Sequence, residues 1–150
     1  MVIPLERAYA YGGSGNEQAH SVIATKDGGS IVTGRTVSGG AGGYDAMVMR
    51  LNANQDQLWT QTVGFSRSDS GYAAVEANNG DVIMVGEVDN DSVNNANGLI
   101  TRFSADGTHL RSFALGDGAT ESLQAITKTS DGGYVVAGKG GSSMLMARFN

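Results

Sequence analysis

The chain contains no cysteine, only one proline and few charged residues. Without cysteine there is no disulfide framework and no thiolate chemistry. Charged residues make up 17% of the 150 residues, and the net charge of −5 comes with scattered basic residues, which argues against nucleic-acid and anionic-membrane partners. No apolar run approaches the roughly 20 residues that span a bilayer. Residues 1–13 lack the basic head and long apolar stretch of a signal peptide.

Glycine is abundant instead, and its 23 residues recur at fixed places rather than in a low-complexity tract. Three segments align without gaps: SVIATKDGGSIVTG, AAVEANNGDVIMVG and AITKTSDGGYVVAG. Equivalent positions lie 52 residues apart in several sets: Gly34, Gly86 and Gly138; Asp27, Asn79 and Asp131; Gly28, Gly80 and Gly132; Gly12, Gly64 and Gly116; Glu17, Asp69 and Glu121. So many positions in one register indicate three copies of one unit.

The second half of the unit repeats as well. Residues 45–64 match residues 97–116, and the third copy, MLMARFN, comes six residues early because the loop after Gly138 is shorter. Residues 1–11 match the end that the third copy lacks, so the units are circularly permuted. We therefore expect one repeat domain over residues 1–150, with units at about 12–62, 63–114, and 115–150 completed by 1–11.

Each unit has the pattern of four β-strands. Short segments rich in β-branched residues alternate with tight turns, and no helical periodicity persists over ten residues. Asp-Gly and Asn-Gly pairs favour tight hairpins because these residues tolerate positive φ angles. The expected turn residues are Asp27, Gly28, Asn79, Gly80, Asp131 and Gly132. The fold class is therefore predicted to be all-β, and four strands in roughly 50 residues is the size of a propeller blade.

The segments YGGSGNEQAHSVIATKDGGSIVTG and ITKTSDGGYVVAG resemble a β-propeller repeat of bacterial and archaeal proteins, many of them secreted or on the cell surface. The matching positions are Gly12, Gly13, Glu17, Thr25, Asp27, Gly28, Gly29, Gly34, Asp45, Arg50, Leu51 and Trp59. The second copy departs most, since it lacks the double glycine and the tyrosine. The resemblance implies three four-stranded blades and an extracellular or cell-surface location. It implies no single activity, because propellers host many functions.

Three blades are too few to close a ring, since propellers have roughly four to eight. We expect two chains to form a six-bladed homodimer in which the strand at residues 3–11 pairs with a blade of the other chain. The residues expected in this assembly strand pairing are Ile3, Leu5, Arg7, Tyr9, Leu145, Ala147 and Phe149. The alternatives are a monomeric β-trefoil, a fragment of a longer propeller, and a designed or trimmed propeller.

Repeated acids suggest one candidate site. Glu17, Asp69 and Glu121 precede the first strand of each unit, and Arg67 lies in the same loop of the second copy. If the first strands line the ring axis, these side chains surround one channel mouth and could bind a cation or a basic group. The alternative interpretation is that each acid accepts backbone N–H groups of its own loop.

Aromatic residues suggest a second candidate site. Tyr44, Trp59 and Tyr72 could stack on sugars, although Trp59 is also a candidate for packing between blades. Methionines within the strands are expected in the core between blades: Met47, Met49, Met84, Met144 and Met146.

Catalytic and metal motifs are missing from the sequence. His20 and His109 are not at equivalent positions of the repeat, no nucleophile elbow is present, and the acids of residues 89–97 lack the glycine and distant glutamate of a calcium loop. We therefore predict no cofactor, no metal and no enzyme activity. The preferred function is a self-assembling propeller scaffold. The alternatives are a carbohydrate-binding or adhesion module that binds glycans, and a propeller hydrolase or lyase.

Overall fold

The computed structural model describes residues 7–89 and 95–150, and these residues form eleven strands. The strands are β1 (Glu17–Ala24), β2 (Ser30–Thr36), β3 (Asp45–Leu51), β4 (Gln57–Val63), β5 (Ser70–Glu76), β6 (Val82–Val88), β7 (Asn97–Phe103), β8 (His109–Leu115), β9 (Glu121–Lys128), β10 (Tyr134–Gly140) and β11 (Ser143–Phe149). Within these ranges there is no helix of the length and apolarity needed to cross a membrane.

The strands form three separate antiparallel sheets, one for each unit of the repeat. The first sheet has the order β1-β2-β3-β4, the middle sheet β5-β6-β7-β8, and the third sheet β11-β10-β9. The prediction of an all-β fold is confirmed. Among the described strands no unit pairs with another, whereas the closed barrel of a trefoil would require such pairing.

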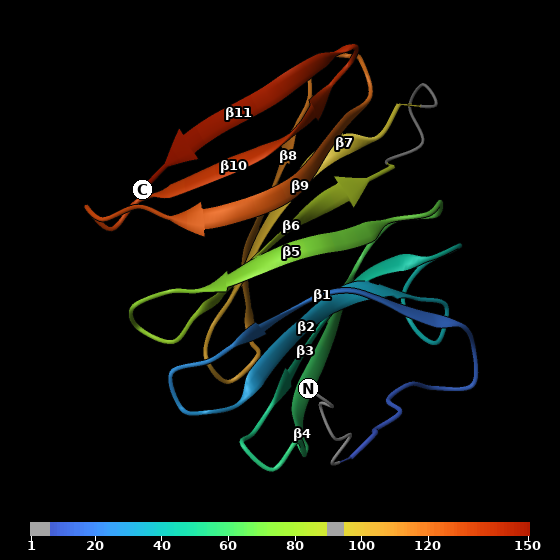
Figure 1. Cartoon of the computed structure of the whole chain (residues 1–150). Helices are drawn as coiled ribbons and strands as arrows, with labels where there is room; N and C mark the ends of the chain where they lie inside the picture. The colour runs from blue at the N-terminus through green and yellow to red at the C-terminus, as the bar shows by residue number, and fades with distance from the viewer. Residues whose placement is uncertain (1–6, 90–94) are drawn as a thin grey trace, which may run out of the picture.

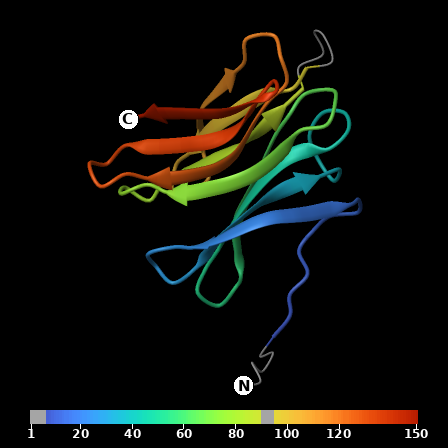
Figure 2. The same cartoon turned by 45° about the horizontal axis from the view of Figure 1, so that its top comes forward.

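The three sheets stand side by side with the first strand of each on a common side. Strand β5 contacts both β1 and β9, and Figure 1 shows these three strands next to one another. The middle sheet therefore has a neighbour on both faces, whereas each outer sheet has a neighbour on one. Figure 2 shows the described N-terminal segment beside the first sheet and the C-terminus beside the third, with the middle sheet between them.

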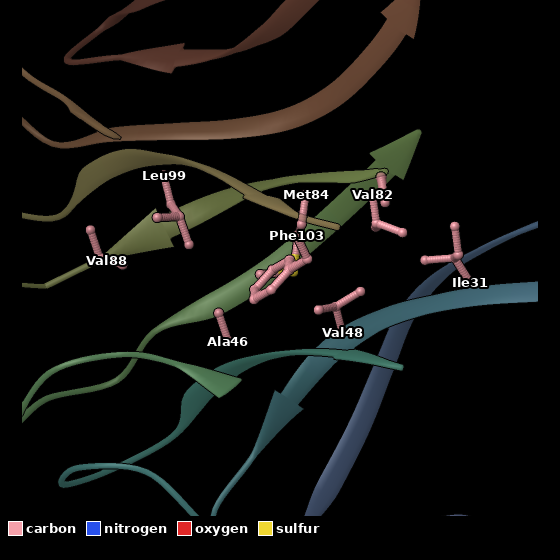
Figure 3. Close-up of a cluster of buried hydrophobic side chains, with 9 residues drawn as sticks. Ile31, Ala46, Val48, Val82, Met84, Val88, Leu99 and Phe103 are labelled. Atoms are coloured by element: carbon pink, nitrogen blue, oxygen red, sulfur yellow. The ribbon is translucent and has the colours of Figure 1, made fainter. Parts of the chain in front are cut away.

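The core lies in the two seams between sheets. In the first seam, Ile31 and Val48 from the first sheet meet Val82, Met84 and Phe103 from the middle sheet (Figure 3). Phe103 is 1% exposed, and burial of such a side chain contributes about 3 kcal/mol. These contacts join the first two units into one body.

The second seam packs Val85 of the middle sheet against Leu123 and Val136 of the third sheet, all three fully buried. At the edge of this seam, the ring of Tyr134 stacks on the ring of Phe149, with 5.4 Å between the ring centroids. Neighbouring residues Met84 and Val85 thus enter opposite seams. The apolar run at residues 82–85 of β6 follows from the burial of the strand on both faces.

A glycine in the second strand of each sheet faces a β-bulge in the first strand. Gly34, Gly86 and Gly138 all lie so close to that strand that a Cβ atom would overlap a backbone carbonyl oxygen. At Gly86 the oxygen belongs to Ser70, whose carbonyl carbon would lie 2.9 Å from the added atom. Close backbone approach therefore explains the 52-residue spacing of these glycines.

Candidate functional site

The predicted turn residues lie in the hairpins that connect the first two strands of each sheet. Gly28, Gly80 and Gly132 adopt φ angles of 83°, 86° and 90°, which side chains disfavour. Asp27 accepts hydrogen bonds from the Thr25 hydroxyl and from the Gly29 N–H. These side chains hold the turn itself, and Asp131 does the same in the third unit.

Arg50 links the first turn to the middle sheet. Its guanidinium bonds Asp27 at 3.0 Å, Glu76 at 3.2 Å and the carbonyl of Gly80 at 3.1 Å, and the arginine side chain is 8% exposed. Hydrogen bonds from Thr25 and then from Arg50 lower the pKa of Asp27 to about 2. The charges are thus paired across the seam.

The equivalent arginines have different surroundings. Arg102 bonds Asp81 at 2.7 Å within its own sheet, and Lys128 occupies the position of Glu76 in the next unit. Arg148 bonds Asp131 at the outer face of the third sheet, where its side chain is 53% exposed. One repeat position therefore carries one buried arginine and two that are far more exposed.

This contrast gives a prediction with an internal control. Arg50→Met removes the cation from a buried network and leaves Glu76 with the Lys26 N–H but without the ion pair to Arg50, so we expect a loss of roughly 3 kcal/mol in the free energy of unfolding. Arg148→Met removes a pair that is exposed in the single chain and, at concentrations too low for two copies to associate, should cost less than about 1 kcal/mol. Urea denaturation measures both. Equal losses would contradict the assignment of Arg50 as the residue that joins the two sheets.

Two of the repeated acids are held by hydrogen bonds that come in part from the end of the second strand of their sheet and the connection that follows it. Asp69 is fully buried and accepts the N–H groups of Phe65 at 2.6 Å and Asp89 at 2.7 Å. Glu17 accepts the hydroxyls of Thr36 and Ser38, and the Ser38 hydrogen bond lowers the pKa of Glu17. The two carboxylates thus tie the connection that precedes the first strand to the end of the second strand and the connection that follows it.

Two carboxyl groups approach each other in the first seam. Asp45 is 2% exposed and lies beside Gly64 together with Asp69. Burial raises the pKa of both groups, and the charge of Asp45 raises that of Asp69 further. Arg67, which lies in the connection between β4 and β5, pairs at 3.5 Å with Asp89, which follows β6.

Glu121 is the third acid and is 4% exposed. Burial and then the neighbouring Asp117 raise the pKa of its carboxyl group, and its Oε2 atom has no hydrogen-bond partner among the described residues. It borders a hollow of about 470 Å³ between the end of β8 and strand β11. Glu121 therefore lies on the side of the third sheet that borders this hollow.

Each of the three aromatic residues predicted to stack on sugars has a partner within the chain. Trp59 packs across the first seam, where its Nε1 donates to the carbonyl of Ala105 at 3.0 Å and its ring covers Gly107. Tyr44 lies under the guanidinium of Arg35, 4.2 Å from its ring centroid. Tyr72 donates its hydroxyl to Glu87 at 2.7 Å. All three rings are half-buried; Trp59 contacts the middle sheet, and Tyr72 stacks on His20 of the first sheet.

The methionines also divide by sheet. Met47, Met49 and Met84 are buried, but Met144 is 86% and Met146 is 72% exposed in β11. These two side chains point away from the middle sheet, since their strand neighbours Leu145 and Ala147 pack in the second seam. The outer face of the third sheet is therefore an uncovered apolar surface.

The predicted assembly residues lie at opposite ends of the molecule. Leu145, Ala147 and Phe149 belong to β11, which is the edge of the third sheet. Arg7 and Tyr9 precede the first strand and form no strand in the single chain, and the predicted residues Ile3 and Leu5 lie outside the described part. The two groups are not brought together within one chain.

The segment at residues 7–11 nevertheless lies in a specific place. The Tyr11 hydroxyl donates to the carbonyl of Gln55 at 2.6 Å, and Arg7 and Tyr9 border a hollow with residues 53–55. One repeat further on, β4 also lies against residues 105–107, but it does so through Trp59, whose repeat equivalent is Arg7 rather than Tyr11. The segment therefore lies against the same turn of the first sheet that β4 contacts on the middle sheet.

The sequence pattern did not predict the residues that form the β-bulges. His20, Tyr72 and Gln124 are each skipped in the register between the first and second strands, and they too lie 52 residues apart. Their residue types differ, so only the equivalent spacing could have identified them.

Within residues 7–89 and 95–150, no three His, Cys, Asp or Glu side chains group as metal ligands. No protein-family model and no curated protein matches the chain.

Proposed function

We propose that this chain is one half of a six-bladed β-propeller, a non-enzymatic module whose activity is assembly with a second copy. The observation that supports the proposal most is the contact of residues 7–11 with residues 53–55, because β4 contacts the equivalent residues 105–107 one repeat further on. Within residues 7–89 and 95–150, the third sheet has three strands and β11 is its open edge. A second copy would supply each missing part to the other.

The register of the complete sheets tells which residues would pair. In the first sheet, Ala46, Val48 and Arg50 face Val63, Gln61 and Trp59. Transferred by the repeat, this register places Met144, Met146 and Arg148 opposite Tyr11, Tyr9 and Arg7 of the other copy. Methionine sulfur against a tyrosine ring is a favourable contact.

The same register fills the hollow beside β11. Leu145 and Ala147 would face Ala10 and Ala8 of the other copy, whose small side chains point toward the middle sheet. The hollow of about 470 Å³ includes Leu145, Ala147 and Leu115 in its lining. Its position on the open side of β11 supports an additional strand there.

The outer face of the first sheet offers the complementary surface. Val22 is 65% exposed on β1, whereas its repeat equivalent Ala74 is 4% exposed in the first seam. The large exposed side chains Met144 and Met146 lie on the corresponding outer face of the third sheet. Joining these two faces twice closes a ring with both apolar surfaces buried, which is the favourable outcome in water.

The test uses the absence of native cysteine. Tyr9→Cys combined with Met146→Cys should give a covalent dimer under mild oxidation, because directly opposed side chains in an antiparallel pair have Cβ atoms about 5 Å apart. Native mass spectrometry of the unmodified chain should give twice 15.4 kDa. Each single cysteine variant, and Tyr9→Cys with Leu110→Cys, serves as the control. A stable monomer without cross-linking would refute the proposal.

A further inference from the structure

The three bulges lie next to one another on the side where the first strands of the sheets meet. His20 belongs to β1, Tyr72 to β5 and Gln124 to β9, and these strands are neighbours in Figure 1. A bulge releases one residue from the ladder and re-aims its side chain, and bulges are frequent next to functional sites. His20 and Tyr72 therefore occupy a candidate binding position.

His20 and Tyr72 form an ordered aromatic pair. Their ring centroids are 5.2 Å apart with an angle of 30° between the planes. The His20 Nδ1 atom lies 3.0 Å from the carbonyl oxygen of Gly71, and because a carbonyl only accepts, Nδ1 carries the proton. In the neutral ring this leaves Nε2 as a hydrogen-bond acceptor.

Polar side chains surround this pair. The Tyr72 hydroxyl donates to Glu87 at 2.7 Å, and Arg35 occupies the repeat position equivalent to Glu87. Arg35 donates through Nε to Gln18 at 3.0 Å and lies 4.2 Å from the ring centroid of Tyr44. All six side chains are held by a contact; five of them are partly accessible, and Gln18 is exposed.

The balance of groups indicates the class of ligand. One cation, Arg35, and one anion, Glu87, cancel, so the cluster has no excess charge that would select an ion. It presents donors and acceptors beside aromatic rings, and sugars combine hydroxyl groups with an apolar C–H face. Groups fixed in advance also reduce the entropy that binding costs.

We propose that His20, Arg35, Tyr44, Tyr72 and Glu87 form a binding site for a neutral sugar ring. This inference goes beyond assembly, because all five side chains belong to one chain and the cluster is complete without a second copy. Tyr44 and Tyr72 supply aromatic surface, Arg35 donates hydrogen bonds, and Glu87 accepts them. Trp59 takes no part, because its ring packs between the sheets.

The experiment is an NMR titration of the ¹⁵N-labelled protein with glucose, galactose, mannose, N-acetylglucosamine and the anionic glucuronate. A concentration of about 10 mM would occupy most of a site whose Kd is ~1 mM. We expect at least one neutral sugar to shift the amides of residues 18–20, 35, 44, 72 and 87. Binding of glucuronate alone, shifts confined elsewhere, or no shift with any sugar would overturn the proposal.

Matched variants separate the sugar site from the fold and from assembly. Tyr72→Ala should weaken binding at least tenfold, and Glu87→Gln, which keeps the side-chain shape, should weaken it several-fold. Phe65→Ala, a half-exposed aromatic outside the cluster, should leave affinity unchanged. The solution mass of every variant is measured in parallel, so loss of the dimer and loss of sugar binding are distinguished. Equal affinity for the Tyr72→Ala and Phe65→Ala variants would refute the site.

Discussion

Replacing Gly86 by valine is expected to unfold the protein. The added Cβ would overlap the carbonyl oxygen of Ser70 and lie 3.0 Å from the Cα of Gly71, and both neighbours are backbone in the central sheet. Relief would require displacement of β5, which contacts both outer sheets. We expect a loss of more than about 4 kcal/mol in the free energy of unfolding, at the severe end for single substitutions.

Thermal and urea denaturation monitored by circular dichroism measure this loss. Gly39→Val is the control, because a Cβ at Gly39 would meet no atom within 4 Å, and its effect should stay within about 0.5 kcal/mol. A Gly86→Val variant as stable as Gly39→Val would show that the bulge and its opposing strand do not approach as closely as described here.

Met146→Glu is expected to convert the proposed dimer into monomers. The side chain is 72% exposed in the single chain, so a carboxylate there costs little before assembly. In the proposed ring it would lie between two blades directly opposite Tyr9 of the other copy, and the nearest cations, Arg148 and Arg7 of the other copy, form the next residue pair on the same face, where Arg148 is already paired with Asp131. A buried charge without a directly opposed partner costs several kcal/mol, and the ring contains the position twice. We expect the dimer to weaken at least about 1000-fold.

Light scattering across a dilution series measures the change. Leu110→Glu is the matched control, because Leu110 is 50% exposed on the outer strand of the middle sheet, away from both outer faces. It should leave the dimer intact. Circular dichroism should show unchanged strand content for both variants. A dimer that persists in Met146→Glu would contradict the proposed interface even if the wild-type chain is dimeric.

Strand placement followed from local pattern. The Asp-Gly and Asn-Gly pairs that begin at residues 27, 79 and 131 have a positive φ angle at the glycine. Such pairs determine the position of a hairpin without help from distant parts of the chain. Between them, β-branched segments have few alternatives to extended structure. Because the 52-residue interval relates whole units, one correct hairpin assignment predicted all three. The division of the chain into separate sheets could be anticipated for the same reason.

Side-chain roles were less predictable because equivalent positions have different neighbours. Arg50 is buried beside Glu76, while Arg148 at the same repeat position is exposed. The sequence pattern could not distinguish them, since burial depends on which sheet stands opposite. The pairing of His20 with Tyr72 was also hidden, because it joins residues of different units through a bulge that no local motif marks.

The sequence by itself determined the number of units, the turns and the all-β character, because these depend on φ preferences and residue spacing within short segments. The tertiary structure alone decided which face of each sheet is covered, where charges are buried and which aromatic rings meet. These properties arise between segments about 50 residues apart, where packing of one sheet against the next fixes the environment. Identical repeat positions can therefore be core in one unit and surface in another.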